Sequence, residues 1–168
     1  APLGMIFGFY ALLQNNDSPV VAYSLLHIFA ATMGIGLASL FITYKPALIM
    51  SALVGSVILF TVMSLYGTVT KRDLTSWYGF LMVGLITLII VGIINVFVGN
   101  TALEFALSAI GVIIFLGFTA ADVQAIQDMV EVDSSTNLEV MGAMSLYLDF
   151  INLFVNLLRL MDILSSDD

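Results

Sequence analysis

Four long stretches of this 168-residue chain contain no Asp, Glu, Lys or Arg, at residues 18–44, 46–70, 74–103 and 105–121. A helix of about 20 apolar residues covers the hydrocarbon core of a bilayer, so runs of this length are typical of membrane-spanning helices. The composition agrees, because 61% of the residues are hydrophobic and 10% are charged, against roughly 45–50% and 25% in soluble proteins. These runs exclude a water-soluble globular domain.

The boundaries of the spans follow from the polar and helix-breaking residues between them. We expect full spans at residues 20–43, 47–69, 77–98, about 102–129 and 138–164, after a shorter apolar helix at residues 2–13. The connections between them are short, which makes sequential helices antiparallel neighbours. The sequence therefore predicts an all-α, polytopic transmembrane helix bundle, with five full spans plus an N-terminal partial helix, folded as one transmembrane domain over residues 1–168.

Charge and cysteine content exclude several function classes. The net charge of −8, with four Lys and Arg in total, argues against a nucleic-acid partner and makes cations the natural electrostatic partners. The absence of cysteine excludes disulfides and thiolate metal sites. The sequence has no phosphate-binding loop, two-histidine zinc pattern or cofactor fingerprint. We therefore expect no enzymatic activity and no tightly bound cofactor.

Two aspartates within the last two apolar segments, Asp122 and Asp149, are the main candidate functional residues. A charge in the hydrocarbon core costs at least about 2.5 kcal/mol and is retained mostly where it has a function. The midpoint between their positions falls in the polar turn at residues 131–137, so a hairpin of antiparallel helices would place both carboxyls at the same depth. Two carboxylates this close cannot both ionise cheaply, so we expect them to share a proton or to bind calcium transiently.

A polar stripe follows each of these two helices, by the 100° rotation between successive residues. On the last helix the stripe is formed by Gly142, Ser145, Asp149, Asn152, Asn156 and Arg159, and on the preceding helix by Glu104, Ser108, Gly111 and Asp122. We expect a common polar seam, in which Asp122 and Asp149 sense protons and gate cations. The pathway lining would comprise Asn152, Asn156, Glu104 and Arg159.

Alternative interpretations of these acids remain open. Asp122 could lie near a helix end, bound by water or by backbone groups, while Asp149 pairs with Arg159 or an Asn amide. An intramembrane aspartyl protease would also use two aspartates on neighbouring helices, but neither aspartate here has a Tyr-Asp or Gly-Leu-Gly-Asp context.

Three further features have simpler explanations. The lone His27 is expected to be hydrogen-bonded within the bundle, because no second His or Cys accompanies it as a metal ligand. Residues 128–139 begin with Asp and end with Glu but lack the central ligands and glycine of an EF-hand, so we expect a solvated acidic loop. Lys71 and Arg72 place the loop at residues 70–76 on the cytoplasmic side by the positive-inside rule.

Two strings near the C-terminus, residues 119–124 (TAADVQ) and 145–158 (SLYLDFINLFVNLL), resemble the last two helices of the Bax inhibitor-1 family. Residues 71–74, 91–95 and 163–168 are most similar to bacterial calcium-leak members of that family. The resemblance covers nearly the whole chain. It implies a seven-helix bundle with the last helix central, which conducts calcium under the control of pH through an aspartate dyad at Asp122 and Asp149.

The chain departs from the family pattern at its N-terminal end. The first helix and about half of the second are absent, so residues 2–13 would be a remnant of helix two in a truncated version of the seven-helix fold. Bacterial relatives also tend to be basic at the end of that helix, where residues 13–16 read Leu-Gln-Asn-Asn.

Together, the residues and the resemblance predict a pH-sensitive calcium leak channel, an integral protein of a bacterial plasma membrane. Its partners would be the lipid bilayer, calcium as the permeant ion, and protons. The alternative is a regulatory membrane subunit that binds a protease or a cell-death protein without ion flux, since a fold does not fix a function. A proton-coupled exchanger is a third possibility.

Overall fold

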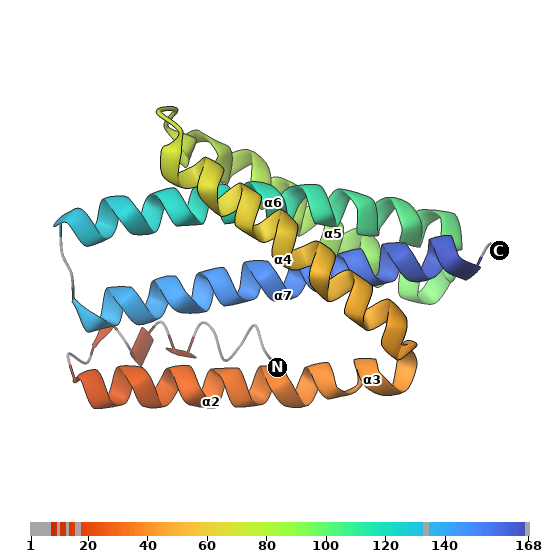
Figure 1. Ribbon diagram of the computed structural model, residues 1–168, viewed down its shortest axis with the longest axis horizontal. Helices are drawn as coiled ribbons and strands as arrows, with labels where there is room; N and C mark the ends of the chain where they lie inside the picture. The colour runs from red at the N-terminus through yellow and green to blue at the C-terminus, as the bar shows by residue number, and fades with distance from the viewer. Residues whose placement is uncertain (1–7, 10, 13, 16–17, 133–134, 167–168) are drawn as a thin grey trace.

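The computed structural model describes residues 8–9, 11–12, 14–15, 18–132 and 135–166, and its regular structure there is helical (Figure 1). The elements are α2 (Pro19–Ala38), α3 (Leu40–Thr43), α4 (Pro46–Val69), the 3-10 turn η1 (Leu74–Ser76), α5 (Trp77–Val98), α6 (Thr101–Val132) and α7 (Thr136–Ser166). The predicted partial helix at residues 2–13 lies mostly outside the described residues, as do Asp133 and the last two residues of the chain.

Five helical segments are long and apolar enough to cross a membrane. They are Pro19–Thr43, Pro46–Val69, Leu74–Val98, Thr101–Val132 and Thr136–Ser166. The predicted all-α, polytopic bundle and its five full spans are therefore confirmed.

The helix ends follow from local chemistry. Pro19 and Pro46 each open a helix, where a fixed φ and a missing N–H carry no penalty. Gly99 ends α5 with a φ of 68°, a left-handed conformation that glycine adopts without steric cost. Before η1, the Asp73 carboxylate accepts the Thr75 N–H at 3.0 Å, and this hydrogen bonding lowers the pKa of Asp73.

The antiparallel pair α6 and α7 forms the centre of the bundle. In Figure 1, α4 crosses both helices, while α2 lies along α7 and α5 packs on α6. In the most apolar window of each span, 39% of the residues of α7 and 33% of those of α6 are buried, against 11–17% for the other three spans. The last helix is thus the most enclosed of the five.

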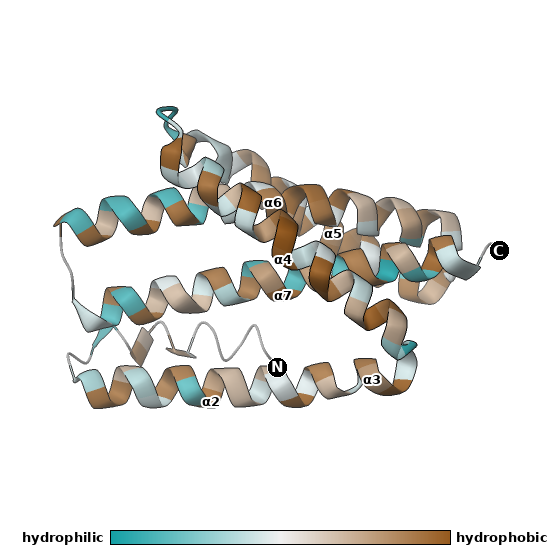
Figure 2. Cartoon of the chain, in the orientation of Figure 1, coloured by the Kyte–Doolittle hydropathy of each residue, from teal (hydrophilic) through white to brown (hydrophobic). Residues whose placement is uncertain are grey.

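The outward faces of the other helices are apolar, as a lipid environment requires. Figure 2 shows the hydrophilic colouring gathered in the loop between α4 and α5, near the α6–α7 turn and along α7. Large apolar side chains such as Ile42 and Phe97 are exposed on the remaining surface. A soluble monomer rarely exposes contiguous apolar area on this scale, so the surface is suited to lipid contact.

Candidate functional site

A cavity of about 1120 Å³ lies on α6 between α5 and α7. Along α5 its lining runs from Tyr78 to Gly99, which corresponds to about 30 Å at 1.5 Å per residue, the thickness of a hydrocarbon core. All six residues predicted to form the site belong to this lining, namely Glu104, Asp122, Asp149, Asn152, Asn156 and Arg159. The cavity therefore follows the bundle over the width that a spanning helix covers.

The carboxyl groups of Asp122 on α6 and Asp149 on α7 meet at one end of this cavity. They lie close enough to interact both through a hydrogen bond and through charge. Asp149 is 5% exposed, and its Oδ2 atom has no hydrogen-bond partner among the described residues. A buried oxygen without a partner costs free energy, so this atom is a natural position for a proton or a cation.

A third side chain, Tyr78 on α5, completes this group. Its hydroxyl donates a hydrogen bond to Oδ1 of Asp122 at 2.5 Å. A hydrogen bond this short is typical of a charge-assisted pair between a hydroxyl and a carboxylate. Side chains from α5, α6 and α7 thus converge on Asp122 and Asp149. Tyr78 was not among the predicted site residues, because no pattern along α5 reveals which of its faces meets α6.

The carboxyl pair lies near one face of the membrane rather than at its centre. Gln124, two residues after Asp122, accepts a hydrogen bond from the Leu74 N–H at 2.8 Å and donates one to the Arg72 carbonyl at 2.7 Å. The loop that it binds contains Lys71, Arg72 and Asp73, which belong outside the hydrocarbon. Gln124 therefore marks where α6 leaves the apolar region, about half a turn beyond Asp122.

Asn152 and Asn156 lie further along the cavity on α7. Their amide N–H groups donate to the carbonyls of Leu148 at 2.8 Å and of Asn152 at 2.7 Å, one turn back on the same helix. The amide oxygen of Asn156 lies against Gly111 of α6, where a β-carbon would overlap it. Asn152 is thus left with an oxygen acceptor for the cavity, while Asn156 belongs to the contact between the two helices.

Glu104 and Arg159 stand apart from the carboxyl pair. Glu104 lies in the first turn of α6, about 27 Å along the helix from Asp122, and Arg159 lies about 15 Å along α7 from Asp149. Both side chains are exposed and line the opposite end of the cavity. The structure therefore pairs Asp149 with Asp122. Glu104 and Arg159 form a separate mouth of the cavity, which carries one negative and one positive charge.

The described residues contain no cluster of three or more His, Cys, Asp and Glu side chains that could hold a metal ion. Calcium takes six to eight oxygen ligands in a resident site, so two carboxyls suit an ion that passes while it retains water. His27 is exposed on α2, and its Nδ1 lies 2.6 Å from the Tyr23 carbonyl oxygen within the same helix.

Removing the phenol hydroxyl in Tyr78→Phe is expected to lower the free energy of unfolding by about 1–3 kcal/mol, because Asp122 loses a donor without regaining full hydration. Thermal unfolding of the purified protein in detergent measures this loss. Tyr23→Phe is the matched control, since Tyr23 is an exposed residue of α2. Equal unfolding temperatures for the two variants would contradict a stabilising role for the hydroxyl of Tyr78.

Comparison with known proteins identifies the family. A family model described as inhibitor of apoptosis-promoting Bax1 matches residues 1–166. Inner membrane protein YbhL of Escherichia coli is 37% identical over 166 residues, which cover 95% of this chain and 70% of that protein. An uncharacterised protein of Rickettsia prowazekii is 37% identical over 163 residues, covering 95% of this chain and 69% of that protein.

A third relative, an uncharacterised membrane protein of Streptococcus pyogenes, is 32% identical over 163 residues, covering 95% of this chain and 71% of that protein. These membrane-protein relatives agree with the five spans, so the predicted integral membrane location is confirmed. The family match covers nearly the whole chain, and the chain belongs to the Bax inhibitor-1 family of polytopic membrane proteins.

Proposed function

We propose that this protein is a pH-sensitive calcium leak channel of a bacterial inner membrane, in which Asp122 and Asp149 sense protons and gate the passage of cations. The observation that carries the proposal is the cavity between α5 and α7, which extends over the width of a bilayer and ends at this carboxyl pair. The inner-membrane relative in Escherichia coli supports the location.

The gate works through the number of protons that the carboxyl pair holds. With one proton, Asp122 and Asp149 are joined by a hydrogen bond that links α6 to α7, and the Tyr78 hydroxyl links α5 to the same group. Without that proton, two negative charges repel each other unless a divalent cation neutralises them. Loss of this proton therefore breaks the hydrogen bond between α6 and α7 and leaves a cation site at the end of the cavity.

The remaining polar lining adjusts the path of the ion. The oxygen of Asn152 offers a neutral ligand one helical turn from Asp149. At the other mouth, Glu104 attracts cations and Arg159 repels them, so their balance sets how readily an ion enters.

The pH dependence is assigned to the carboxyl pair after considering every titratable group that lines the cavity. These groups are Tyr44 beside α3, Tyr78 from α5, Glu104 and Asp122 from α6, and Asp149 and Arg159 from α7. Among them, Asp122 and Asp149 are the acids that touch each other. Two acids in contact exchange protons as a pair, so the charge of this site, rather than that of a separate carboxyl, is the one proposed to respond to pH.

Calcium influx into liposomes that contain the purified protein tests the proposal. We expect influx without any partner protein, with a half-maximal calcium concentration that rises as pH falls, by up to about tenfold per pH unit, because protons and calcium compete for the same oxygens. A calcium-sensitive dye inside the vesicles measures the flux over a series of pH values.

Protein-free liposomes are the control for this experiment. A flux that does not respond to pH would refute the gate. No flux at all from the folded protein would refute the channel and favour a regulatory subunit. A pH-sensitive dye in the same vesicles separates a leak from an exchanger, because an exchanger moves protons in fixed proportion to calcium.

A further inference from the structure

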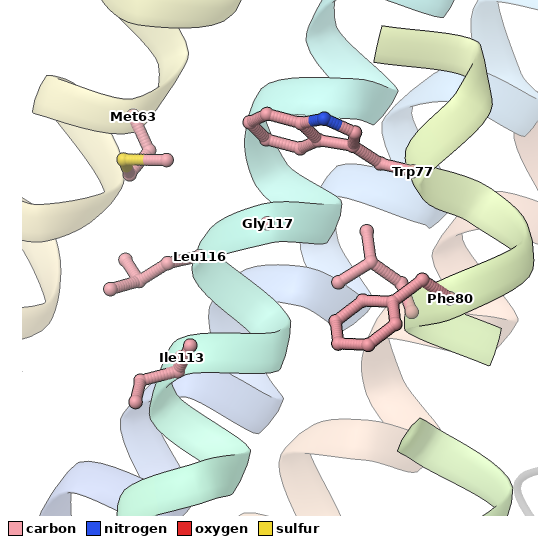
Figure 3. Close-up of a pocket in the computed structure, with 7 residues that line it drawn as sticks. Met63, Trp77, Phe80, Ile113, Leu116 and Gly117 are labelled. Atoms are coloured by element: carbon pink, nitrogen blue, oxygen red, sulfur yellow. The ribbon is translucent and has the colours of Figure 1, made fainter. Parts of the chain in front are cut away.

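A second cavity opens on the outer face of the bundle, away from the carboxyl pair (Figure 3). It has a volume of about 460 Å³, and its lining includes Met63, Trp77, Phe80, Ile113, Leu116 and Gly117. Figure 3 shows Met63 of α4 on one side, Trp77 and Phe80 of α5 on the other, and α6 between them as the floor. We call this space the α4–α5 groove.

The groove faces the surrounding lipid. Phe80 on its wall is 82% exposed and Ile113 on its floor is 68% exposed, while the named lining residues carry no charge. In a bilayer, an apolar hollow left empty would forfeit dispersion contacts along its walls. An acyl chain is the abundant apolar molecule that can restore these contacts.

Trp77 fixes the level at which the groove reaches the membrane interface. It is the first residue of α5, and Tyr66 of α4 stacks on it with ring centroids 6.3 Å apart and an angle of 17° between the rings. Tryptophan and tyrosine favour the headgroup level of a bilayer. The groove therefore runs inward from the interface along α6.

A basic pair, Lys71 and Arg72, lies in the loop between α4 and α5, next to this interfacial end. It holds half of the four Lys and Arg residues in a chain of net charge −8. Both side chains are exposed. The hydrogen bonds of Gln124 to the Arg72 carbonyl and the Leu74 N–H tie the backbone of this loop to α6. The neighbouring Asp73 carboxylate is engaged by the Thr75 N–H.

We propose that the α4–α5 groove binds an anionic phospholipid, whose acyl chain lies between Met63 and Trp77 on α6 and whose phosphate contacts Lys71 and Arg72. An apolar slot beside a pair of positive charges complements a molecule that carries a hydrocarbon chain and a negative headgroup. This binding site is separate from the carboxyl pair and does not depend on the proposed channel function.

Fluorescence of the full chain offers a direct test, because Trp77 is its one tryptophan and lines the groove. The protein is placed in bilayers that contain increasing fractions of phosphatidylglycerol or phosphatidylcholine with brominated chains, which quench tryptophan on contact. We expect the anionic lipid to quench Trp77 with a relative binding constant up to roughly thirtyfold higher, because each of the two basic residues contributes about fivefold at such a surface.

Charge variants test the headgroup contact. Lys71→Gln with Arg72→Gln is expected to equalise quenching by the two lipids, and Lys71→Gln alone to reduce the preference. Lys45→Gln is the matched control, because it removes one exposed charge at the other end of α4, and it should leave the preference unchanged. Equal quenching in the unmodified protein, or a preference that survives the double substitution, would overturn the proposal.

Filling the groove tests the acyl-chain contact. Ile113→Phe with Leu116→Phe places larger side chains on the floor of the groove and should reduce quenching of Trp77 by both lipids. These residues face outward or are partly exposed, so the bundle can accommodate them. If neither lipid quenches Trp77 in the unmodified protein, something other than lipid covers the groove and the proposal fails.

Discussion

Asp122→Asn and Asp149→Asn are each expected to flatten the pH dependence of calcium flux. An asparagine keeps the volume of the side chain but holds no titratable proton, so the remaining aspartate has no neighbouring acid with which to share one. The half-maximal calcium concentration, which should change by up to about tenfold per pH unit in the unmodified protein, should then change much less with pH. Flux into liposomes at several pH values measures this loss.

Matched controls exist on the same two helices. Asp128→Asn on α6 and Asp162→Asn on α7 change exposed acids that are not part of the cavity lining, so both should retain the pH dependence. The double variant Asp122→Asn with Asp149→Asn should resemble either single variant, because residues that act as a unit are not additive. Unchanged pH profiles in both single variants would remove the carboxyl pair from the mechanism.

The spans and the meeting of α6 with α7 could be predicted from sequence because each depends on position along the chain. The length of each uncharged run can be compared with the thickness of a bilayer. Two residues equally far from a tight turn reach the same depth in an antiparallel hairpin. The polar stripe on α7 also predicted which face of this helix turns toward the bundle, since its polar residues recur on one face of an otherwise apolar helix. For Asp149, the sequence therefore predicted the span that contains it, its depth in the hairpin and the face of α7 on which it lies.

Tyr78 and Gln124 could not be predicted, because neither contact follows from the sequence pattern of a single helix. α5 is apolar on nearly every side, so its sequence does not distinguish the face that meets α6 from the face that meets lipid. The position of the carboxyl pair near one membrane face was hidden for a related reason. It depends on where the loop at residues 70–73 meets α6, and that contact joins segments about fifty positions apart.

Glycines illustrate the same limit. A β-carbon built on Gly34 or Gly79 meets nothing within 4 Å, whereas one built on Gly67 would overlap the backbone of Ala120 on α6. All three glycines lie within apolar helices. Only the crossing of α4 over α6 shows that a close contact requires Gly67, whereas Gly34 and Gly79 lie in open space.

Gly67→Ala is accordingly expected to destabilise the bundle strongly. The added methyl group would overlap the carbonyl of Ala120, and a backbone atom in the middle of a helix cannot rotate away as a side chain can. Overpacking typically costs about 1–3 kcal/mol, and a clash with backbone belongs at the upper end. Thermal unfolding of the purified protein in detergent measures the loss.

Gly79→Ala on α5 is the matched control for this substitution. With no neighbour within 4 Å, it should leave stability unchanged or raise it by roughly 0.5–1 kcal/mol, because alanine loses less conformational entropy in a helix than glycine does. Similar unfolding temperatures for the two variants would show that α4 does not touch α6 at Gly67. Because Ala120 lies two residues before Asp122, a shift of α4 away from α6 should disturb the carboxyl pair as well, so the pH dependence of flux and the stability of Gly67→Ala should fall together.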